Sequence, residues 1–128
     1  MTNQSEVEDE LNYQIKAIGL PAPERQAKII PCRRFAFDFV WSEFRLAVDV
    51  QGGTWKPNTG HSSGTGIERD CEKLNLAILN GWRVLFVTTG MVNSGMALRY
   101  IEDAIKASPA GGKETSGIVS GYCGILLG

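Results

Sequence analysis

The chain has 128 residues, of which 43% are hydrophobic and 21% charged, and its formal net charge is −1. This size and composition fit one compact domain with its own core and argue against a second domain. No apolar run approaches the roughly 20 residues that a membrane span needs, and the acidic N-terminus is unlike a signal peptide. We therefore expect a cytoplasmic protein with no membrane partner.

The metal-binding chemistry open to this sequence is narrow. Its three cysteines, Cys32, Cys71 and Cys123, are far apart and form no C-x-x-C pair, which argues against a zinc knuckle or a disulfide framework. The single histidine, His61, excludes a histidine-rich site. Any metal would be held mainly by carboxylate and carbonyl oxygens, so magnesium, with manganese as its substitute, is the natural candidate.

The N-terminal segment has helix signals. Ser5 as N-cap, Glu8 at the capping-box position and Gly19 after the end predict a helix over residues 5–18. Its expected inner face consists of Val7, Leu11, Ile15 and Ile18. Residues 21–26 read as a connector, and residues 28–32 as a short extended piece.

The next segment alternates as a hairpin does. Residues 35–40 place three phenylalanines on one face and Asp38 on the other, and residues 45–51 place Asp49 among apolar neighbours. A turn centred between Ser42 and Glu43 would pair position 38 with 47 and position 36 with 49. The two aspartates would then lie diagonally on one face, whereas a one-residue change in the turn would put them on opposite faces.

The second half of the chain adds a loop, two helices and a strand. Residues 52–66 are rich in Gly, Ser and Thr and predict a long loop. A helix over 67–80, with an inner face of Ile67, Cys71, Leu74 and Ile78, precedes a central strand over 82–88 that is covered on both sides. A last helix spans about 92–107. We predict a single α/β domain over residues 1–108, with a mixed β-sheet flanked by helices, and a Gly-rich C-terminal tail over 109–128 that is either flexible or an edge strand or dimer contact.

Two carboxylates on one face near strand ends can hold a divalent cation. Asp38 and Asp49 would be its ligands, and the carbonyl of Val50 would add another oxygen. Such a cation would also explain why acids stand in otherwise buried strands. The alternative is that Asp38 pairs with Arg34 or Arg45 and that Asp49 lies at an exposed edge.

These residues resemble the PD-(D/E)xK nuclease superfamily, and more closely small phage and bacterial endonucleases related to very-short-patch-repair endonucleases. The resemblance is carried by FDFVW, the strand ending in DVQGGTW, ERD in the next helix and LNGWRVLFVT, over about residues 34–88. It implies a restriction-endonuclease-like core and a magnesium-dependent DNA endonuclease of a bacterial or phage-infected cell. Many small nucleases need two copies to cut two strands, so a homodimer is a further expectation.

The resemblance also assigns roles to residues. Asp38, Asp49 and Val50 would bind the metal, and Glu10 or Glu6 in the first helix would hold a metal-bound water. Gln51 stands where the family has its catalytic lysine, and glutamine cannot supply that positive charge. Lys73 is the expected substitute, because some members carry this lysine on the neighbouring helix. The alternative for Lys73 is a solvated residue paired with Asp70 or Glu72.

DNA contacts are expected in the long loop and among the central basic residues. Trp55 would stack on a base or ribose while Lys56 contacts a phosphate, although Trp55 could equally anchor the loop to the core. Arg34 and Arg69 would contact the backbone. His61 would act as a general base or phosphate contact, although a lone loop histidine is more often incidental.

The predicted reaction is phosphodiester hydrolysis by a metal-activated water. Two other functions are kept open. One is a dimeric Holliday-junction-resolving nuclease, and the other is a catalytically inactive nucleic-acid-binding module on the same fold, for which Gln51 is the main argument.

Overall fold

The structure is a computed structural model that describes residues 4–51 and 64–107. Its elements, in chain order, are α1 (Gln4–Ala17), β1 (Glu24–Lys28), β2 (Ala36–Trp41), the 3₁₀ turn η1 (Ser42–Phe44), β3 (Leu46–Gln51), α2 (Gly64–Leu79), β4 (Arg83–Thr88), α3 (Thr89–Ser94) and α4 (Met96–Lys106). The predicted α/β class with a mixed sheet flanked by helices is confirmed.

The sheet has the order β1-β2-β3-β4. The pairs β1–β2 and β2–β3 are antiparallel, whereas β3 and β4 are parallel and are joined through α2. A parallel pair needs such a crossover, since its strands enter the sheet from the same end. Both carboxylates of interest therefore lie on inner strands, Asp38 on β2 and Asp49 on β3.

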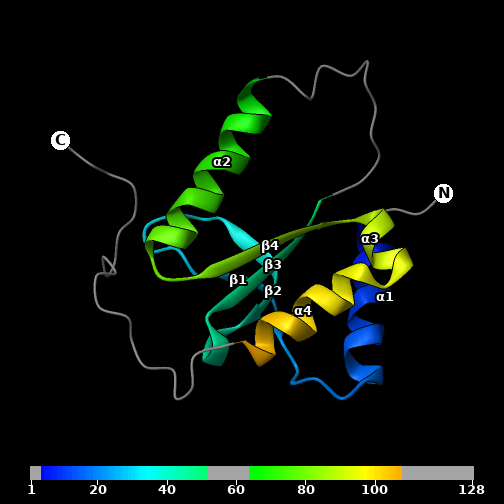
Figure 1. The fold of residues 1–128 in the computed structure, drawn as a ribbon. Coiled ribbons are helices and arrows are strands. Elements are labelled where there is room, and N and C mark those ends of the chain that lie inside the picture. Colours follow the sequence, from blue (N-terminus) through cyan, green and yellow to red (C-terminus); the bar gives the residue numbers. More distant parts are fainter. Residues whose placement is uncertain (1–3, 52–63, 108–128) are drawn as a thin grey trace.

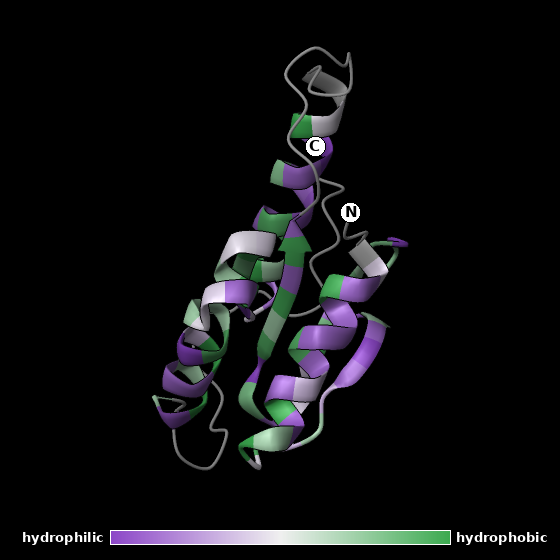
Figure 2. Cartoon of the chain, turned by 90° about the vertical axis from the view of Figure 1, so that its right-hand side faces the viewer, coloured by the Kyte–Doolittle hydropathy of each residue, from purple (hydrophilic) through white to green (hydrophobic). Residues whose placement is uncertain are grey.

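Helices cover both faces of the sheet. Figure 1 shows α2 on one side and α1, α3 and α4 on the other. The larger core cluster joins the second group of helices to the sheet, and the smaller one joins α2 to it through Leu76 and Ala77. In Figure 2 the strand between the helices is mostly hydrophobic, whereas the helices carry hydrophilic segments as well.

The inner face of α2 differs from the predicted one. Ile67 and Ile78 are more than half exposed and Cys71 is exposed, so three of the four residues of the predicted inner face point outward, whereas Leu74 is half-buried. Leu76 and Ala77 instead pack on the sheet. The face of α2 that covers the sheet also brings the polar residue Lys73 inward, where it pairs with Asp49.

Other boundaries also differ from the predictions. The predicted connector over residues 21–26 contains the start of β1, which covers half of that segment and ends where the extended piece was expected to begin. Gly95, with φ of +89°, divides the predicted last helix into α3 and α4. Strand β4 has helices on both faces, but within the described residues it is an outer strand of the sheet. The predicted tail over 109–128 lies outside the described residues.

Two isoleucines of the helices differ in burial and should therefore differ in their contribution to stability. Ile15 in α1 is fully buried against the sheet, whereas Ile78 in α2 is 52% exposed. We expect Ile15→Ala to lower the free energy of unfolding by about 2–5 kcal/mol, because it removes buried methyl groups and leaves a cavity. Ile78→Ala should change it by only about 0.5 kcal/mol. Urea unfolding of the two variants and the parent protein measures both effects, and equal losses would contradict the assigned faces.

Candidate functional site

The two aspartates lie opposite each other where strands β2 and β3 separate. The paired residues end at Phe39 and Val48, and the same register continued by one step places Asp38 opposite Asp49. The predicted register is therefore wrong by two residues. The turn is centred one residue later than expected, because Arg45 adopts a left-handed conformation with φ of +52° after the 3₁₀ turn.

Side-chain oxygens replace ladder carbonyls at this point. The backbone N–H of Asp38 donates to Oδ1 of Asp49 at 3.2 Å, and the backbone N–H of Val50 donates to Oδ2 of Asp38 at 2.8 Å. Each aspartate is thus hydrogen-bonded to the strand of the other. Both residues are buried, with exposed fractions of 7% and 8%, so these bonds offset part of the desolvation cost of the carboxylates.

The strict alternation predicted for β2 is interrupted at Asp38. Phe37 packs in the cluster on the α2 side of the sheet, whereas Phe39 packs in the cluster on the α1 side. Residues two apart on a regular strand share a face, so the strand is irregular between them. This irregularity directs the carboxylate of Asp38 toward the gap between the strands.

Asp49 is paired with Lys73 of α2. The Nζ of Lys73 lies 2.7 Å from Oδ2 of Asp49 and 4.4 Å from the centre of the Phe37 ring. Burial raises the pKa of the Asp49 carboxyl above its ordinary value, Lys73 opposes that rise, and the nearby charge of Asp38 adds to it. The alternatives for both residues are therefore wrong: Asp49 is not at an exposed edge, and Lys73 pairs with Asp49 rather than with Asp70 or Glu72.

Asp38 has a partner that the sequence did not indicate. The side-chain amide of Gln26 in β1 donates to Oδ1 of Asp38 at 2.8 Å, so neither Arg34 nor Arg45 is needed as its partner. Gln26 adopts φ of +50°, an uncommon conformation for a residue other than glycine, at the strand position opposite Asp38. A strained residue that contacts a buried carboxylate is a functional candidate.

An acid of α1, Glu8, reaches this network, whereas the predicted Glu10 does not. Gln26 also donates to Oε1 of Glu8 at 3.3 Å. Glu10 instead accepts from Gln14 on the exposed surface of the helix, and Gln14 also contacts the backbone of α3. Residues two apart on a helix point about 200° apart, so Glu8 and its neighbours Glu6 and Glu10 face different ways.

The carboxylate oxygens of this site are suitable ligands for a hard cation, but each already has a protein partner. All four carboxylate oxygens of Asp38 and Asp49 accept a hydrogen bond or ion pair. Each carboxylate oxygen has a second lone pair, so a cation could still bind. Among the described residues, no group of three or more histidine, cysteine or acidic side chains is placed to hold a metal ion.

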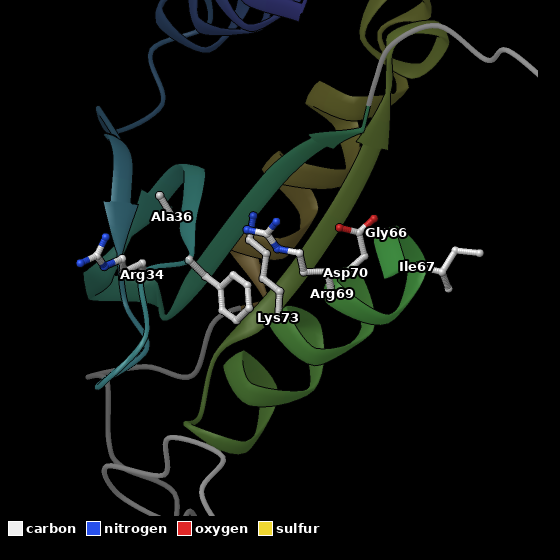
Figure 3. A pocket seen from close by; sticks show the side chains of 8 residues that line it. Arg34, Ala36, Gly66, Ile67, Arg69, Asp70 and Lys73 are labelled. Carbon is white, nitrogen blue, oxygen red and sulfur yellow. The ribbon is translucent and has the colours of Figure 1, made fainter. Parts of the chain in front are cut away.

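The other residues predicted for the site lie beside it, at the end of β3, or outside the described residues. Arg34 and Arg69 line a cavity of about 540 Å³ that Lys73 also lines (Figure 3). Gln51 is the last residue of β3, opposite Thr88 and half-buried. His61, Trp55 and Lys56 lie outside the described residues.

Two central basic residues have structural contacts. Arg83 donates to the backbone carbonyls of Ala104 and Phe44, and Arg45 lies 4.8 Å from the centre of the Trp82 ring. Both therefore connect elements at the end of the sheet where β4 begins. This leaves Arg34 and Arg69 as the predicted nucleic-acid contacts that line the cavity beside Lys73.

Comparisons with protein-family models, with curated proteins and with solved structures gave no match. None of the described helices has the length and apolar character that crossing a membrane requires. The site must therefore be interpreted from its own geometry.

The ion pair predicts a pH-dependent loss of stability when Lys73 is replaced. In Lys73→Met the pKa of Asp49 should rise further, because burial then acts without the opposing cation. A folded protein with a raised carboxyl pKa retains a proton that the unfolded chain has already released, so stability decreases as pH rises through that interval. We expect a loss of about 3–5 kcal/mol at neutral pH, the cost of an unpaired buried charge, and a smaller loss in acid.

Urea unfolding over a pH series measures this effect. Lys106→Met is the matched control, because Lys106 forms an exposed pair with Glu102 on the other side of the sheet. Adding Asp49→Asn to Lys73→Met should remove the pH dependence, since asparagine has no proton to release. A pH-independent loss in Lys73→Met alone would contradict the assigned coupling.

Proposed function

We propose that this protein is a metal-dependent DNA endonuclease that hydrolyses phosphodiester bonds. The observation that carries the proposal is the pair of buried carboxylates, Asp38 and Asp49, with the ammonium of Lys73 at 2.7 Å from one of them. Two acids and a cation converging at a splayed strand pair can hold a divalent cation and stabilise a charged phosphate.

The order of elements supports the resemblance to the PD-(D/E)xK superfamily. A helix precedes the β2–β3 hairpin, and a helix and a strand follow it, as the resemblance implies. Gln51 departs from the family pattern, in which this position is a lysine. Lys73 of the neighbouring helix α2 supplies a positive charge at Asp49. On this basis we assign the domain a restriction-endonuclease-like core.

The proposed cofactor is magnesium, with manganese as a substitute. Asp38 and Asp49 would hold the ion, with the carbonyl of Val50 as a further oxygen donor, and a bound ion would supply the Lewis-acid chemistry that activates water. The ion would also reduce the repulsion between the two carboxylates, which contributes to the raised pKa of Asp49. Lys73 would stabilise the negative charge that develops on the phosphate, the role that Gln51 cannot fill.

A catalytically inactive nucleic-acid-binding module is the second candidate. It is favoured by the observation that protein donors already reach all four oxygens of the two carboxylates. For such a module, Lys73 would occupy the place of a metal ion permanently, and the two aspartates would serve only to join β2 and β3. The two candidates differ in whether a divalent ion can bind beside Lys73.

Cleavage assays separate these candidates. We expect the protein to cut supercoiled plasmid or a four-way junction with magnesium or manganese and not with EDTA. Asp38→Asn and Asp49→Asn should reduce cleavage to the EDTA background, because each removes a charged ligand. Preference for the four-way junction would identify a junction-resolving nuclease.

The matched control is Asp103→Asn, since Asp103 is an exposed acid of α4 that pairs with Arg99. It should cut as the parent does. Binding of DNA without metal-dependent cleavage by the parent protein would favour the inactive module. Full activity in both Asp38→Asn and Asp49→Asn would contradict the site itself.

Gln26 should act as a positioning residue for Asp38. Gln26→Leu keeps a side chain of similar size but removes the donor to Asp38, so the carboxylate is no longer fixed against β1. We expect kcat to fall about 10- to 100-fold, as for other residues that orient a metal ligand, with KM for DNA nearly unchanged. A rise in KM at constant kcat would instead place Gln26 in DNA binding.

A further inference from the structure

The cavity beside Lys73 is a candidate subsite of its own. It has a volume of about 540 Å³, within the roughly 300–1,000 Å³ range of small-ligand pockets, and lies between the first turns of α2 and the chain that enters β2. Figure 3 shows Arg69 and Lys73 extending from α2 toward the strands, with Arg34 and Ala36 on the opposite wall. Lys73 lines the cavity from the α2 side and also forms the ion pair with Asp49.

The charge of the cavity favours an anion. Its lining includes Arg34 and Arg69 against the single carboxylate of Asp70, and also Lys73, whose charge is paired with Asp49. The ion pairs among the described residues include none for Arg34 or Arg69, whereas the adjacent Arg33 is paired with Glu72. Two exposed guanidinium groups at the rim are therefore available to a phosphate, an anion that arginine can bind with bidentate geometry.

The cavity also has an apolar wall. Phe35 lines it, and its ring lies 6.0 Å from the guanidinium carbon of Arg69 and 5.1 Å from that of Arg33. An aromatic ring beside arginines is the combination that single-strand-binding proteins use to hold a base and its phosphate. A base in duplex DNA is paired and stacked, so only an unpaired nucleotide can enter such a pocket.

We propose that this pocket binds one unpaired nucleotide of a DNA strand, next to the scissile phosphate that would be held by Lys73 and by a metal ion on Asp38 and Asp49. This inference rests on the proposed function and specifies its substrate: DNA that is single-stranded or branched at the site of attack. The chain has a net charge of −1 and presents only two unpaired arginines at the described cavity, which suits contact with one strand.

Fluorescence anisotropy in EDTA tests the pocket without depending on cleavage. The probes are a short labelled single strand, the matched duplex and the same duplex with a single-stranded flap. We expect the single strand and the flap to bind at least about tenfold more tightly than the duplex. Arg69→Gln and Arg34→Gln should each weaken single-strand binding and reduce the slope of log affinity against log salt by about 0.7.

Arg99→Gln is the matched control, because Arg99 is an exposed arginine of α4 on the other side of the sheet. Thermal unfolding of each variant establishes that it is folded. Equal or tighter binding of the duplex, no binding of any probe, or equal affinity of Arg69→Gln and Arg99→Gln would overturn the proposal. Tight single-strand binding without metal-dependent cleavage would retain the pocket and reject the nuclease.

Discussion

The burial of two neighbouring carboxylates is the constraint on which the site depends. Placing Asp38 and Asp49 side by side inside a sheet is unfavourable unless donors surround them, because both desolvation and mutual repulsion oppose it. Here two backbone N–H groups, the amide of Gln26 and the ammonium of Lys73 supply those donors. Three separate elements, β1, β3 and α2, are therefore fixed relative to β2 by one electrostatic requirement.

The orientation of α2 shows how this requirement competes with apolar burial. Turning Lys73 toward Asp49 leaves Ile67 and Ile78 more than half exposed. The sheet still receives apolar cover from Leu76 and Ala77, and the ammonium of Lys73 lies over the ring of Phe37, so little core is lost. An unpaired buried carboxylate costs more than two partly exposed isoleucines, which explains why the charged residue faces inward.

Local patterns predicted most of the elements, but they missed β1 and the division of the last helix at Gly95, and they did not give the relative placement of the elements. Alternation identified β2 and β3, and capping identified α1, since both signals depend on near neighbours. The register depended on one left-handed residue, Arg45, which shifts the turn by one position. Gln26 lay in a proline-containing segment without alternation, so its role becomes visible only once β1 is paired with β2. Helix rotation likewise decided between Glu8 and Glu10.

The position of Lys73 couples the pocket to the carboxylates. Lys73 lines the cavity, and its ammonium also opposes the rise in the pKa of Asp49 that burial causes. An anion bound in the cavity would attract the same ammonium and weaken its ion pair with Asp49. The affinity of the Asp49 carboxylate for another positive charge would then increase. A divalent cation neutralises two neighbouring carboxylates more fully than a single proton does, because it carries two positive charges and can bind oxygens of both. On the proposed function, binding of a phosphate in the cavity and binding of a metal at the two carboxylates would favour each other, because Lys73 contacts both places.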